Sequence, residues 1–435
     1  MHNDHYSERG QAIIVIAGAL VGLLGMAALA VDGAMVYADR RQLQSVADNA
    51  VMSAAAKAAM ALDQRAINFQ SFICNSPDMI ESMIIARDAT IEGAVASGYE
   101  MDADISDDNG VEISCHVVNN NGLIDDYLDI RIKIVAQTQT AFTRFVTPNG
   151  ISNMVESVSR VRPRRSLAQG NAIASLGSEC GGVDMNGNDT IVINGGGIFS
   201  NSCLDFRGNT DITINVDIGG IGYMTTFTEA GNVDINITPE QATDGLAIVD
   251  IPTPDCINQP DYGGLEVSGT QTINGGRYSY INLNGDDHLM LNPGLYCLYG
   301  NFQTNGNQTL EVNPDAPMNQ GVTIYMAAGD ILLNGNSNVR LRAPAIYQPP
   351  AIKGLLIYMP PSNPGSITLT GAEDSWFRGT VYAPTGAINV GGSVDILYSS
   401  EFVGNTVYIN GSATIMITDD AMVNYTRPPM IELNR

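Results

Sequence analysis

The sequence predicts a mixed fold with three ordered parts. These are an N-terminal transmembrane helix that continues as a stalk, a small α+β domain, and a C-terminal right-handed parallel β-helix, that is, a β-solenoid. An uncharged apolar run at residues 12–31 predicts the first part, and alternating strand-like segments before residue 165 predict the second. A glycine-centred pattern that recurs from about residue 180 predicts the third. We therefore divide the chain into 1–11 (cytoplasmic), 12–31 (transmembrane), 32–65 (helical stalk), 66–165 (α+β domain) and 166–435 (β-solenoid).

The apolar run reads AIIVIAGALVGLLGMAALAV and has the length that a helix needs to cross a bilayer. A cleaved signal peptide is the alternative, but such signals have a shorter apolar core and a basic flank. Arg9 precedes the run, whereas Arg40 and Arg41 follow it, and this distribution leans against a cytoplasmic N-terminus. All six cysteines follow the run, which favours a bulk outside the cytoplasm. We expect a single-pass protein of the cell membrane with a cytoplasmic N-terminus and a periplasmic or extracellular body.

Residues 32–65 are rich in strong helix formers and contain no proline. Val36, Leu43, Val46 and Ala50 lie on one stripe of such a helix. The membrane helix is therefore expected to continue outward as a stalk. Its small-residue face is expected to pack on the protein's own domain, with a partner helix as the alternative.

Several motifs around this helix carry a family resemblance. They are Arg9-Gly-Gln-Ala, Val31-Asp32-Gly33, Tyr37, Arg40-Arg41-Gln42-Leu43-Gln44 and Ala47-Asp48-Asn49-Ala50. Together with the apolar run, they resemble the N-terminal module of TadG-like proteins, which are pseudopilin-related accessory proteins of tight-adherence (Flp) pilus systems. The resemblance implies an N-terminus inside and a body outside. Processed pilins carry a glutamate five residues after a glycine, but Val15 stands at that offset from Gly10. Cleavage by a prepilin peptidase and polymerisation as a major pilin are therefore not expected.

The segment 66–165 predicts a helix over residues 77–97 and strands over 111–118 and 128–138. The run from Asp129 to Pro163 resembles the strand–turn–strand that closes the pseudopilin-like head of Tad proteins. Acidic residues between 102 and 112 fit a solvated loop better than a calcium site, because the EF-hand glycine and glutamate are missing. The arginines in the stretch that ends this segment predict a linker between domains: Arg160, Arg162, Arg164 and Arg165.

From about residue 180 the chain repeats two short apolar-alternating strands joined by a glycine corner, as in Val183–Ile193. Alternation sends the apolar side chains to one face, which stacked copies bury together. Glycine at the corner accepts φ > 0, and stacked asparagines can bond to one another along the corner. A β-sandwich is the alternative fold. The predicted corners are Gly187, Gly208, Gly269, Gly306, Gly335, Gly391 and Gly411, with looser copies at Gly231 and Gly371.

Four segments of this region also resemble the C-terminal β-helical domain that is fused to many Tad-type surface proteins. They are 292–297, 321–325, 354–357 and 377–384. This resemblance implies a fold and a surface location, and it implies no particular chemistry.

The even number of cysteines outside the apolar run predicts disulfides. Free buried thiols and a metal site are the alternatives. The chain has no CxxC, and His2, His5, His116 and His288 have no ligand spacing, so we predict no metal site. Chain order suggests the pairs Cys74–Cys115, Cys180–Cys203 and Cys256–Cys297.

The net charge of −25 argues against nucleic acid as a partner. No catalytic or nucleotide-binding motif occurs, and we predict no catalytic residue and no cofactor. Because β-solenoids include polysaccharide lyases and hydrolases, the carboxylates Asp184, Asp205, Asp286 and Asp287 were weighed as a catalytic set. Asp184 and Asp205 occupy equivalent repeat positions, but other repeats hold other residue types there, which favours solvated surface positions.

The sequence thus predicts a non-enzymatic, membrane-anchored accessory protein of a Tad/Flp pilus or related surface apparatus, acting in assembly, anchoring or adhesion. Tad/Flp pilus or secretion components are the expected partners, and a surface polysaccharide is a further one. The alternatives are a carbohydrate-binding adhesin unrelated to pili and a polysaccharide lyase or hydrolase built on a β-helix.

Overall fold

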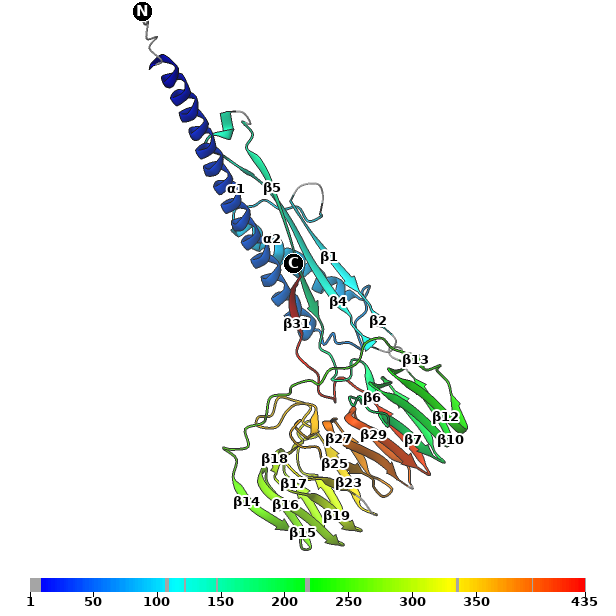
Figure 1. Cartoon of the computed structure of the whole chain (residues 1–435). Coiled ribbons are helices and arrows are strands. Elements are labelled where there is room, and N and C mark those ends of the chain that lie inside the picture. The colour runs from blue at the N-terminus through cyan, green and yellow to red at the C-terminus, as the bar shows by residue number, and fades with distance from the viewer. Residues whose placement is uncertain are drawn as a thin grey trace, which may run out of the picture.

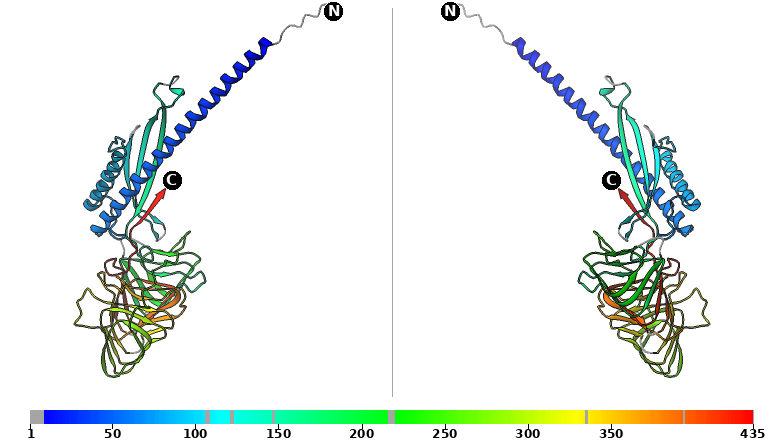
Figure 2. Two further views of the ribbon diagram at one scale, coloured as in Figure 1. Left: turned by 90° about the vertical axis from the view of Figure 1, so that its left-hand side faces the viewer. Right: turned by 90° about the vertical axis from the view of Figure 1, so that its right-hand side faces the viewer.

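The computed structural model describes residues 9–105, 109–120, 123–145, 148–215, 220–333, 336–392 and 394–434. A helix-and-sheet unit lies along the inner half of a long N-terminal helix, and a large region of stacked strands follows at its far end (Figures 1 and 2). The predicted long apolar N-terminal helix and the predicted strand-rich C-terminal region are both confirmed.

The N-terminal helix α1 runs from Arg9 to Gln64 without a break. The apolar side chains from Ile13 to Val31 are exposed, and an 18-residue window of the helix has a mean hydropathy of 2.6 with no part of it buried in the protein. From Leu43 onward the helix buries a face made mostly of alanine. One continuous helix therefore provides both an apolar rod and a packing surface.

The unit beside α1 is an α+β layer. Helix α2, Pro77–Ala96, begins at Ser76, whose hydroxyl accepts a hydrogen bond from the backbone N–H of Met79, with proline in the first turn. The sheet is antiparallel in the order β1-β4-β5-β31, and both helices contact it. Its strands, with the minor elements nearby, are β1 (Gly110–His116), β2 (Asn119–Asn120), β3 (Leu123–Ile124), β4 (Tyr127–Thr138), η1 (Thr143–Phe145), β5 (Ile151–Arg162) and β31 (Met430–Asn434).

The last strand, β31, returns from the C-terminal region to pair with β5, with Leu433 opposite Ser159. The sequence division placed these residues in the β-solenoid, and nothing in their pattern indicated the return. Because both the entry into and the exit from the C-terminal region are held in one sheet, the two parts of the chain are joined by two covalent connections.

The arginine-rich stretch forms part of this sheet, where a linker was expected. Arg160 and Arg162 lie in β5, and Arg160 pairs with Asp129 at 2.9 Å. Arg162 bonds to Asp125 and also to Glu432 of β31. The arginines therefore form ion pairs with acidic residues on other parts of the chain. Those partners are not neighbours in sequence, so the arginine spacing alone indicated a linker.

The C-terminal region consists of strands that pair in parallel with strands of the next layer. Strands three apart in sequence form many of the pairs: β21 with β24, β22 with β25, and β23 with β26. The strands before the chain crosses over are β6 (Asn171–Ser175), β7 (Val183–Gly187), β8 (Thr190–Asn194), β9 (Gly197–Ser200), β10 (Cys203–Asn215), β11 (Ile221–Tyr223), β12 (Thr226–Ile235) and β13 (Glu240–Gln241). Those after it are β14 (Asp261–Glu266), β15 (Thr270–Ile273), β16 (Gly276–Gly285), β17 (His288–Leu291), β18 (Gly294–Leu298), β19 (Phe302–Gly306), β20 (Thr309–Val312), β21 (Val322–Met326), β22 (Ile331–Leu333), β23 (Asn338–Arg342), β24 (Leu355–Tyr358), β25 (Ser366–Leu369), β26 (Trp376–Arg378), β27 (Thr380–Gly392), β28 (Ile396–Ser399), β29 (Phe402–Gly411) and β30 (Thr414–Thr418).

The layers do not follow chain order in space. The first strands, β6 to β8, pair with the late strands β29 and β30 on one side and with β9 and β10 on the other. The chain therefore starts in the middle of the stack, winds out to β13, crosses to the opposite end at β14, and winds back until β29 and β30 meet the first layer (Figure 1).

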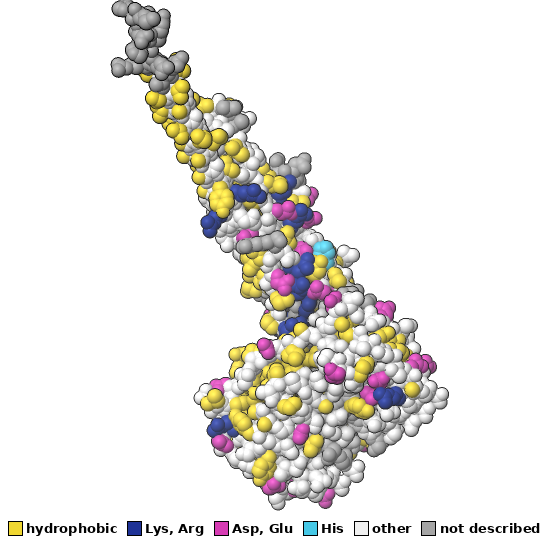
Figure 3. All heavy atoms as spheres, in the orientation of Figure 1, with side chains coloured by type: hydrophobic (Ala, Val, Ile, Leu, Met, Phe, Trp, Pro, Cys, Tyr) yellow, Lys and Arg dark blue, Asp and Glu magenta, His cyan; other side chains and the backbone are white. Residues whose placement is uncertain are grey.

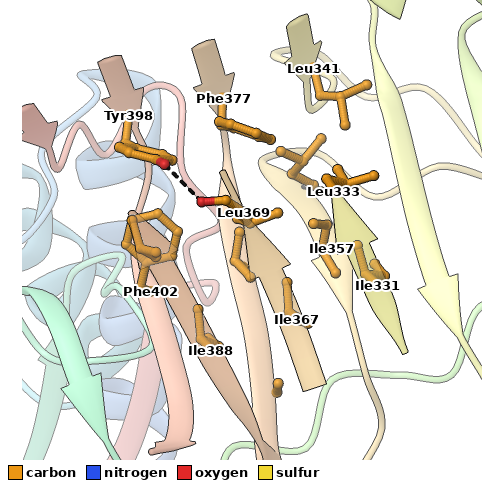
Figure 4. Close-up of a cluster of buried hydrophobic side chains, with 14 of the residues drawn as sticks. Ile331, Leu333, Leu341, Ile357, Ile367, Leu369, Phe377, Ile388, Tyr398 and Phe402 are labelled. Carbon is orange, nitrogen blue, oxygen red and sulfur yellow. Dashed lines mark hydrogen bonds between the residues drawn. The ribbon is translucent and has the colours of Figure 1, made fainter. Parts of the chain in front are cut away.

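The interior of the stack is a continuous apolar core of Ile, Leu, Val and aromatic side chains. Figure 4 shows equivalent positions of successive layers in contact, such as Ile331, Ile367 and Ile388. The Tyr398 hydroxyl donates to the backbone carbonyl of Leu369 at 3.0 Å, so this buried aromatic has a partner for its one polar group. Each fully buried aliphatic side chain contributes on the order of 2 kcal/mol, so burial between the layers stabilises the stack.

The crossover, residues 242–260, lies along the outside of the stack as a strap. Leu246 and Ile251 share one buried cluster with residues from several layers, including Phe199 and Tyr358. The Tyr382 hydroxyl donates to the carbonyl of Val249 at 2.8 Å and accepts from its N–H at 2.9 Å. The strap thus covers one face of the stack and connects layers that are distant in space.

Replacing Tyr382 with phenylalanine should lower the free energy of unfolding by about 1–2 kcal/mol, because both backbone groups of Val249 lose their partner. Denaturant titration of the purified protein measures this change. Tyr299→Phe removes a hydroxyl from a half-exposed ring and should be neutral. Equal effects of the two substitutions would show that the strap contributes no measurable stability through Tyr382.

Glycine corners meet between layers. Gly208 has φ of +94° and lies opposite Gly187 and Gly231 in the flanking strands. A Cβ at Gly208 would overlap the carbonyl oxygen of Gly187, and one at Gly391 would overlap that of Asn410. Among the predicted corners, Gly208, Gly269 and Gly306 have positive φ. At Gly187, Gly391 and Gly411 the close approach of a neighbouring layer is what requires glycine. Gly335 lies outside the described residues.

Asparagine side chains beside these corners bond to one another from layer to layer. Asn209 donates to Asn188 at 2.8 Å, and Asn232 donates to Asn209 at 3.0 Å. A second ladder follows the same rule: Asn313 donates to Asn292, which donates to Asn274. Each of these surface amides bonds to its equivalent in the next layer, as expected for stacked strands.

Candidate functional site

The exposed apolar part of α1 is the first feature that points to a function. We call Ile13–Val31 the apolar segment. Its large side chains are exposed, such as Leu24 at 69% exposure, and they form the yellow rod at the upper end of Figure 3. At 1.5 Å per residue the segment is roughly 28 Å long, close to the thickness of a bilayer's hydrocarbon core. Water-exposed apolar surface of this extent is unfavourable, which indicates an apolar environment around it.

The inner half of α1 packs on the protein's own α+β unit, as predicted. Leu43, Ala47 and Ala50 are buried against α2 and the sheet, and Val46 is partly buried there. At Gly93 of α2 a Cβ would lie 3.3 Å from the Cα of Ala50, so the two helices approach closely because both carry small residues. The Ser157 hydroxyl of β5 donates to Asp48 at 2.7 Å. The motif residues Leu43, Ala47, Asp48 and Ala50 are thus the ones that pack α1 on the α+β unit.

Asp32 lies between the two halves and forms a clamp on the tip of the β4–β5 hairpin. Its side chain is only 3% exposed. Oδ1 accepts the backbone N–H of Ala141 at 2.8 Å and of Phe142 at 3.0 Å, and Oδ2 accepts the N–H and the hydroxyl of Thr143, both at 2.6 Å. The carboxylate therefore caps the start of the short helix η1, where free N–H groups favour a negative charge.

Two opposing effects act on the Asp32 carboxyl. Burial alone would raise its pKa, but the hydrogen bonds from Thr143, Phe142 and Ala141 favour the charged form and bring the pKa below its ordinary value. The clamp therefore stabilises the fold above the unfolded-state pKa of about 3.9, and its contribution is lost as the pH falls through the lower folded-state value.

Replacing Asp32 with asparagine should release the hairpin tip. The amide keeps one acceptor oxygen, but it turns an N–H donor toward donors that now lack a partner. Hydrogen exchange of the backbone amides of residues 141–143 should become several-fold faster at neutral pH. Asp39→Asn, at an exposed position of the same helix, should leave that exchange unchanged. Unchanged exchange in Asp32→Asn would contradict the clamp.

Asp32 belongs to the Val31-Asp32-Gly33 motif, but the sequence alone assigns it no role. Its partners lie more than a hundred residues away in the hairpin, so no local spacing could reveal them. The available signal was an acidic residue placed directly after a long apolar run, where an unpartnered charge is costly.

The six cysteines form three disulfides in the pairs that chain order suggests: Cys74–Cys115, Cys180–Cys203 and Cys256–Cys297. The first joins the loop that precedes α2 to β1, and the last joins the strap to β18. The described part of the chain holds no free cysteine.

The carboxylates considered for catalysis lie at two separate places. Asp184 and Asp205 are opposite each other in β7 and β10, one layer apart as the repeat implied. The solvated positions expected for them are wrong, because Asp184 is only 3% exposed and Asp205 is half-buried. Arg207 lies 3.2 Å from Asp184 and 3.4 Å from Asp205, so one guanidinium bridges the two carboxylates and offsets one of their two negative charges. Asp287 accepts backbone N–H groups of Gly269 and Asn284, which is a turn-stabilising role.

Among the described residues no group of three or more His, Cys, Asp or Glu side chains is arranged to hold a metal ion. In the acidic loop, Asp102 and Asp104 are described, whereas Asp107 and Asp108 lie outside the described residues. An open groove lined by polar residues lies at one corner of the stack, where Asp189 is buried and burial raises its pKa. It is lined by Asn188, Asp189, Thr190, Asn209, Thr210, Asp211, Asn232, Asp395, Ser412, Ala413 and Thr414.

Comparison with known proteins locates a family match on α1. Residues 10–57 match the Tad family model, "Putative Flp pilus-assembly TadE/G-like". No curated protein sequence matches the chain. Among solved structures, an ice binding protein from an Antarctic Flavobacteriaceae bacterium shares 12% identity and covers 57% of this chain and 82% of its own, with a TM-score of 0.21, too low to support an argument.

The matched residues run from the start of the apolar segment, through the Asp32 clamp, to the alanine face that holds the body. The match therefore coincides with the part of the chain that joins an apolar rod to an ordered domain. Residues 10–57 of this chain are similar to the TadE/G-like module of the Flp pilus-assembly type.

Proposed function

We propose that this protein is a single-pass, membrane-anchored structural or accessory protein of a Tad/Flp pilus or a related surface apparatus, acting in assembly, anchoring or adhesion without catalysis. One observation carries the proposal: the TadE/G-like match coincides with a helix whose outer part is exposed and apolar and whose inner part holds the body. An anchor and a scaffold in one rigid element suit a component that stays beside an assembly machine.

In this proposal, residues 1–11 lie in the cytoplasm and the body lies in the periplasm or outside the cell. The three disulfides support that side for the body, because such bonds persist in oxidising compartments. The charge distribution around the apolar segment argues the other way, and we give it less weight because Arg40 and Arg41 lie beyond the first two turns of the stalk.

We assign the C-terminal region to the right-handed parallel β-helix class. Parallel pairing of strands three apart, apolar side chains stacked between layers and glycine corners support the assignment. In this proposal the stack would hold a binding surface at a fixed distance from the membrane. The strap and the return of β31 would keep it aligned with the stalk.

The direct test is co-purification from cells that carry a Flp pilus system. After chemical cross-linking and detergent extraction, the tagged full-length chain should retain Flp pilus-assembly proteins. A variant whose apolar segment is replaced by an unrelated apolar sequence of equal length should lose them while staying in the membrane. Absence of pilus-assembly proteins from the unmodified sample would overturn the pilus role.

Carbohydrate binding is a second candidate function, favoured by the corner groove. Amide, hydroxyl and carboxylate groups line it in register over several layers, which is a suitable set of partners for sugar hydroxyls. Retention of the chain on surface polysaccharide, lost in Asp211→Ala, would support it. Asp184 and Asp205 do not line this groove. Because both contact Arg207, they are less suited to act as a catalytic acid–base pair than the groove is to bind a sugar.

A further inference from the structure

The tip of the β4–β5 hairpin carries two exposed aromatic side chains on one short turn. Phe142 is 50% exposed and Phe145 is 77% exposed. The Arg144 guanidinium lies 5.2 Å from the centroid of the Phe145 ring, so an aromatic surface and a cation occupy the same spot. A phenylalanine side chain exposed to water forgoes the free energy that its burial in an apolar environment would give.

The position of this tip is set by the clamp. Asp32 holds the backbone of residues 141–143, and it is the first residue after the apolar segment. Figures 1 and 2 show the hairpin running beside α1, with its tip at the end of the body nearest the exposed half of the helix. If the apolar segment fills the hydrocarbon core, the tip lies at the level where hydrocarbon gives way to lipid headgroups.

The charge pattern of the hairpin fits that location. The chain has 46 Asp and Glu residues, yet residues 130–155 contain none, whereas Arg131, Lys133 and Arg144 lie in this stretch. Arg131 is paired with Glu112 and Glu156 further along the hairpin, so Arg144 is the cation of this stretch that lies at the tip. Residues 139–150, which form the tip, contain no Asp or Glu that anionic lipid would repel. Tyr37, 70% exposed, and the exposed pair Arg40 and Arg41 extend the same chemistry along α1.

We propose that the hairpin tip, residues 141–145, is a membrane-interface foot. Phe142 and Phe145 insert among the upper acyl chains of the leaflet nearest the body, and Arg144 contacts lipid phosphate. Two points of attachment, the helix and the foot, then fix the tilt and height of the body, because a lone helix leaves its tilt in the bilayer free. The inference rests on the proposed membrane anchorage.

The chain offers a clean probe, because Trp376 is its one tryptophan and lies in β26, far from the foot. In a Trp376→Phe background, single tryptophans are introduced by Phe145→Trp, Leu24→Trp and Tyr347→Trp. Full-length protein is reconstituted in phosphatidylethanolamine–phosphatidylglycerol vesicles that contain lipids brominated near the headgroup or deep in the chain.

The expected result distinguishes three depths. Phe145→Trp should show blue-shifted emission and stronger quenching by shallow than by deep bromines. Leu24→Trp should be quenched more by deep bromines, and Tyr347→Trp, at an 87%-exposed site of the C-terminal region, should be quenched by neither. Arg144→Gln in the Phe145→Trp protein should reduce the shallow quenching when phosphatidylglycerol is present.

Quenching at Leu24→Trp without quenching at Phe145→Trp would overturn the foot and leave the anchor standing, and would point to a protein partner at the tip. Absence of quenching at both sites would overturn the proposed anchorage itself.

Discussion

Replacing Gly208 with alanine is expected to destabilise the stack of strands by about 3 kcal/mol or more. The new Cβ would overlap the carbonyl oxygen of Gly187 in the next layer, and the residue would also keep a positive φ that alanine disfavours. The conformational cost is about 1–2 kcal/mol and the overpacking adds a similar amount. Thermal or denaturant unfolding followed by the fluorescence of Trp376, which lies inside the same region, measures the change.

Three other glycines separate the two causes. Gly269→Ala keeps a positive φ without any close neighbour and should cost about 1 kcal/mol. Gly391→Ala has an ordinary φ but overlaps the carbonyl of Asn410, so it measures the contact alone. Gly294→Ala, whose nearest neighbour lies at an ordinary 3.5 Å, should be close to neutral. Equal effects at Gly208 and Gly294 would contradict the close approach of the layers.

Removal of the Cys256–Cys297 disulfide is expected to have the second large effect. This bond ties the strap to β18 and closes a loop with a sequence separation of 41. In the chain-entropy account, such a cross-link contributes about 4 kcal/mol by restricting the unfolded chain. The double replacement of Cys256 and Cys297 by alanine should therefore move the Trp376 unfolding transition to markedly lower denaturant.

The Cys74–Cys115 bond provides a matched control, because its sequence separation is also 41. Its double replacement by alanine should destabilise the α+β unit, read from hydrogen exchange in α2 and β1, and leave the Trp376 transition in place. If both double variants shifted the Trp376 transition equally, the two parts of the chain would unfold as one unit, and the strap would have no separate role.

Local patterns were sufficient for much of this fold. The uncharged apolar run, the alternation around Gly187 and Gly208, and the order of the cysteines each depend on neighbours in sequence, and the structure has the corresponding helix, strands and disulfide pairs. The stripe through Leu43 and Ala50 likewise indicated which face of the helix would be buried.

Long-range features were beyond such patterns. Every layer of the stack alternates in the same way. The pairing of β29 with β27 follows chain order, but nothing in the sequence indicates that β29 also pairs with the early strand β6. The return of β31 and the contact of Arg162 with Glu432 involve residues separated by more than half of the chain. The Asp32 clamp was missed for the same reason, since its carboxylate is satisfied only by a distant hairpin.

The account as a whole depends on whether α1 anchors the body to a membrane. The most direct measurement is alkaline carbonate extraction of membranes from cells that express the full-length chain, combined with protease added to intact spheroplasts. We predict that the protein stays with the membrane pellet and that the protease digests the body. Release of the unmodified protein into the carbonate supernatant, or protection of the body from protease, would contradict the account.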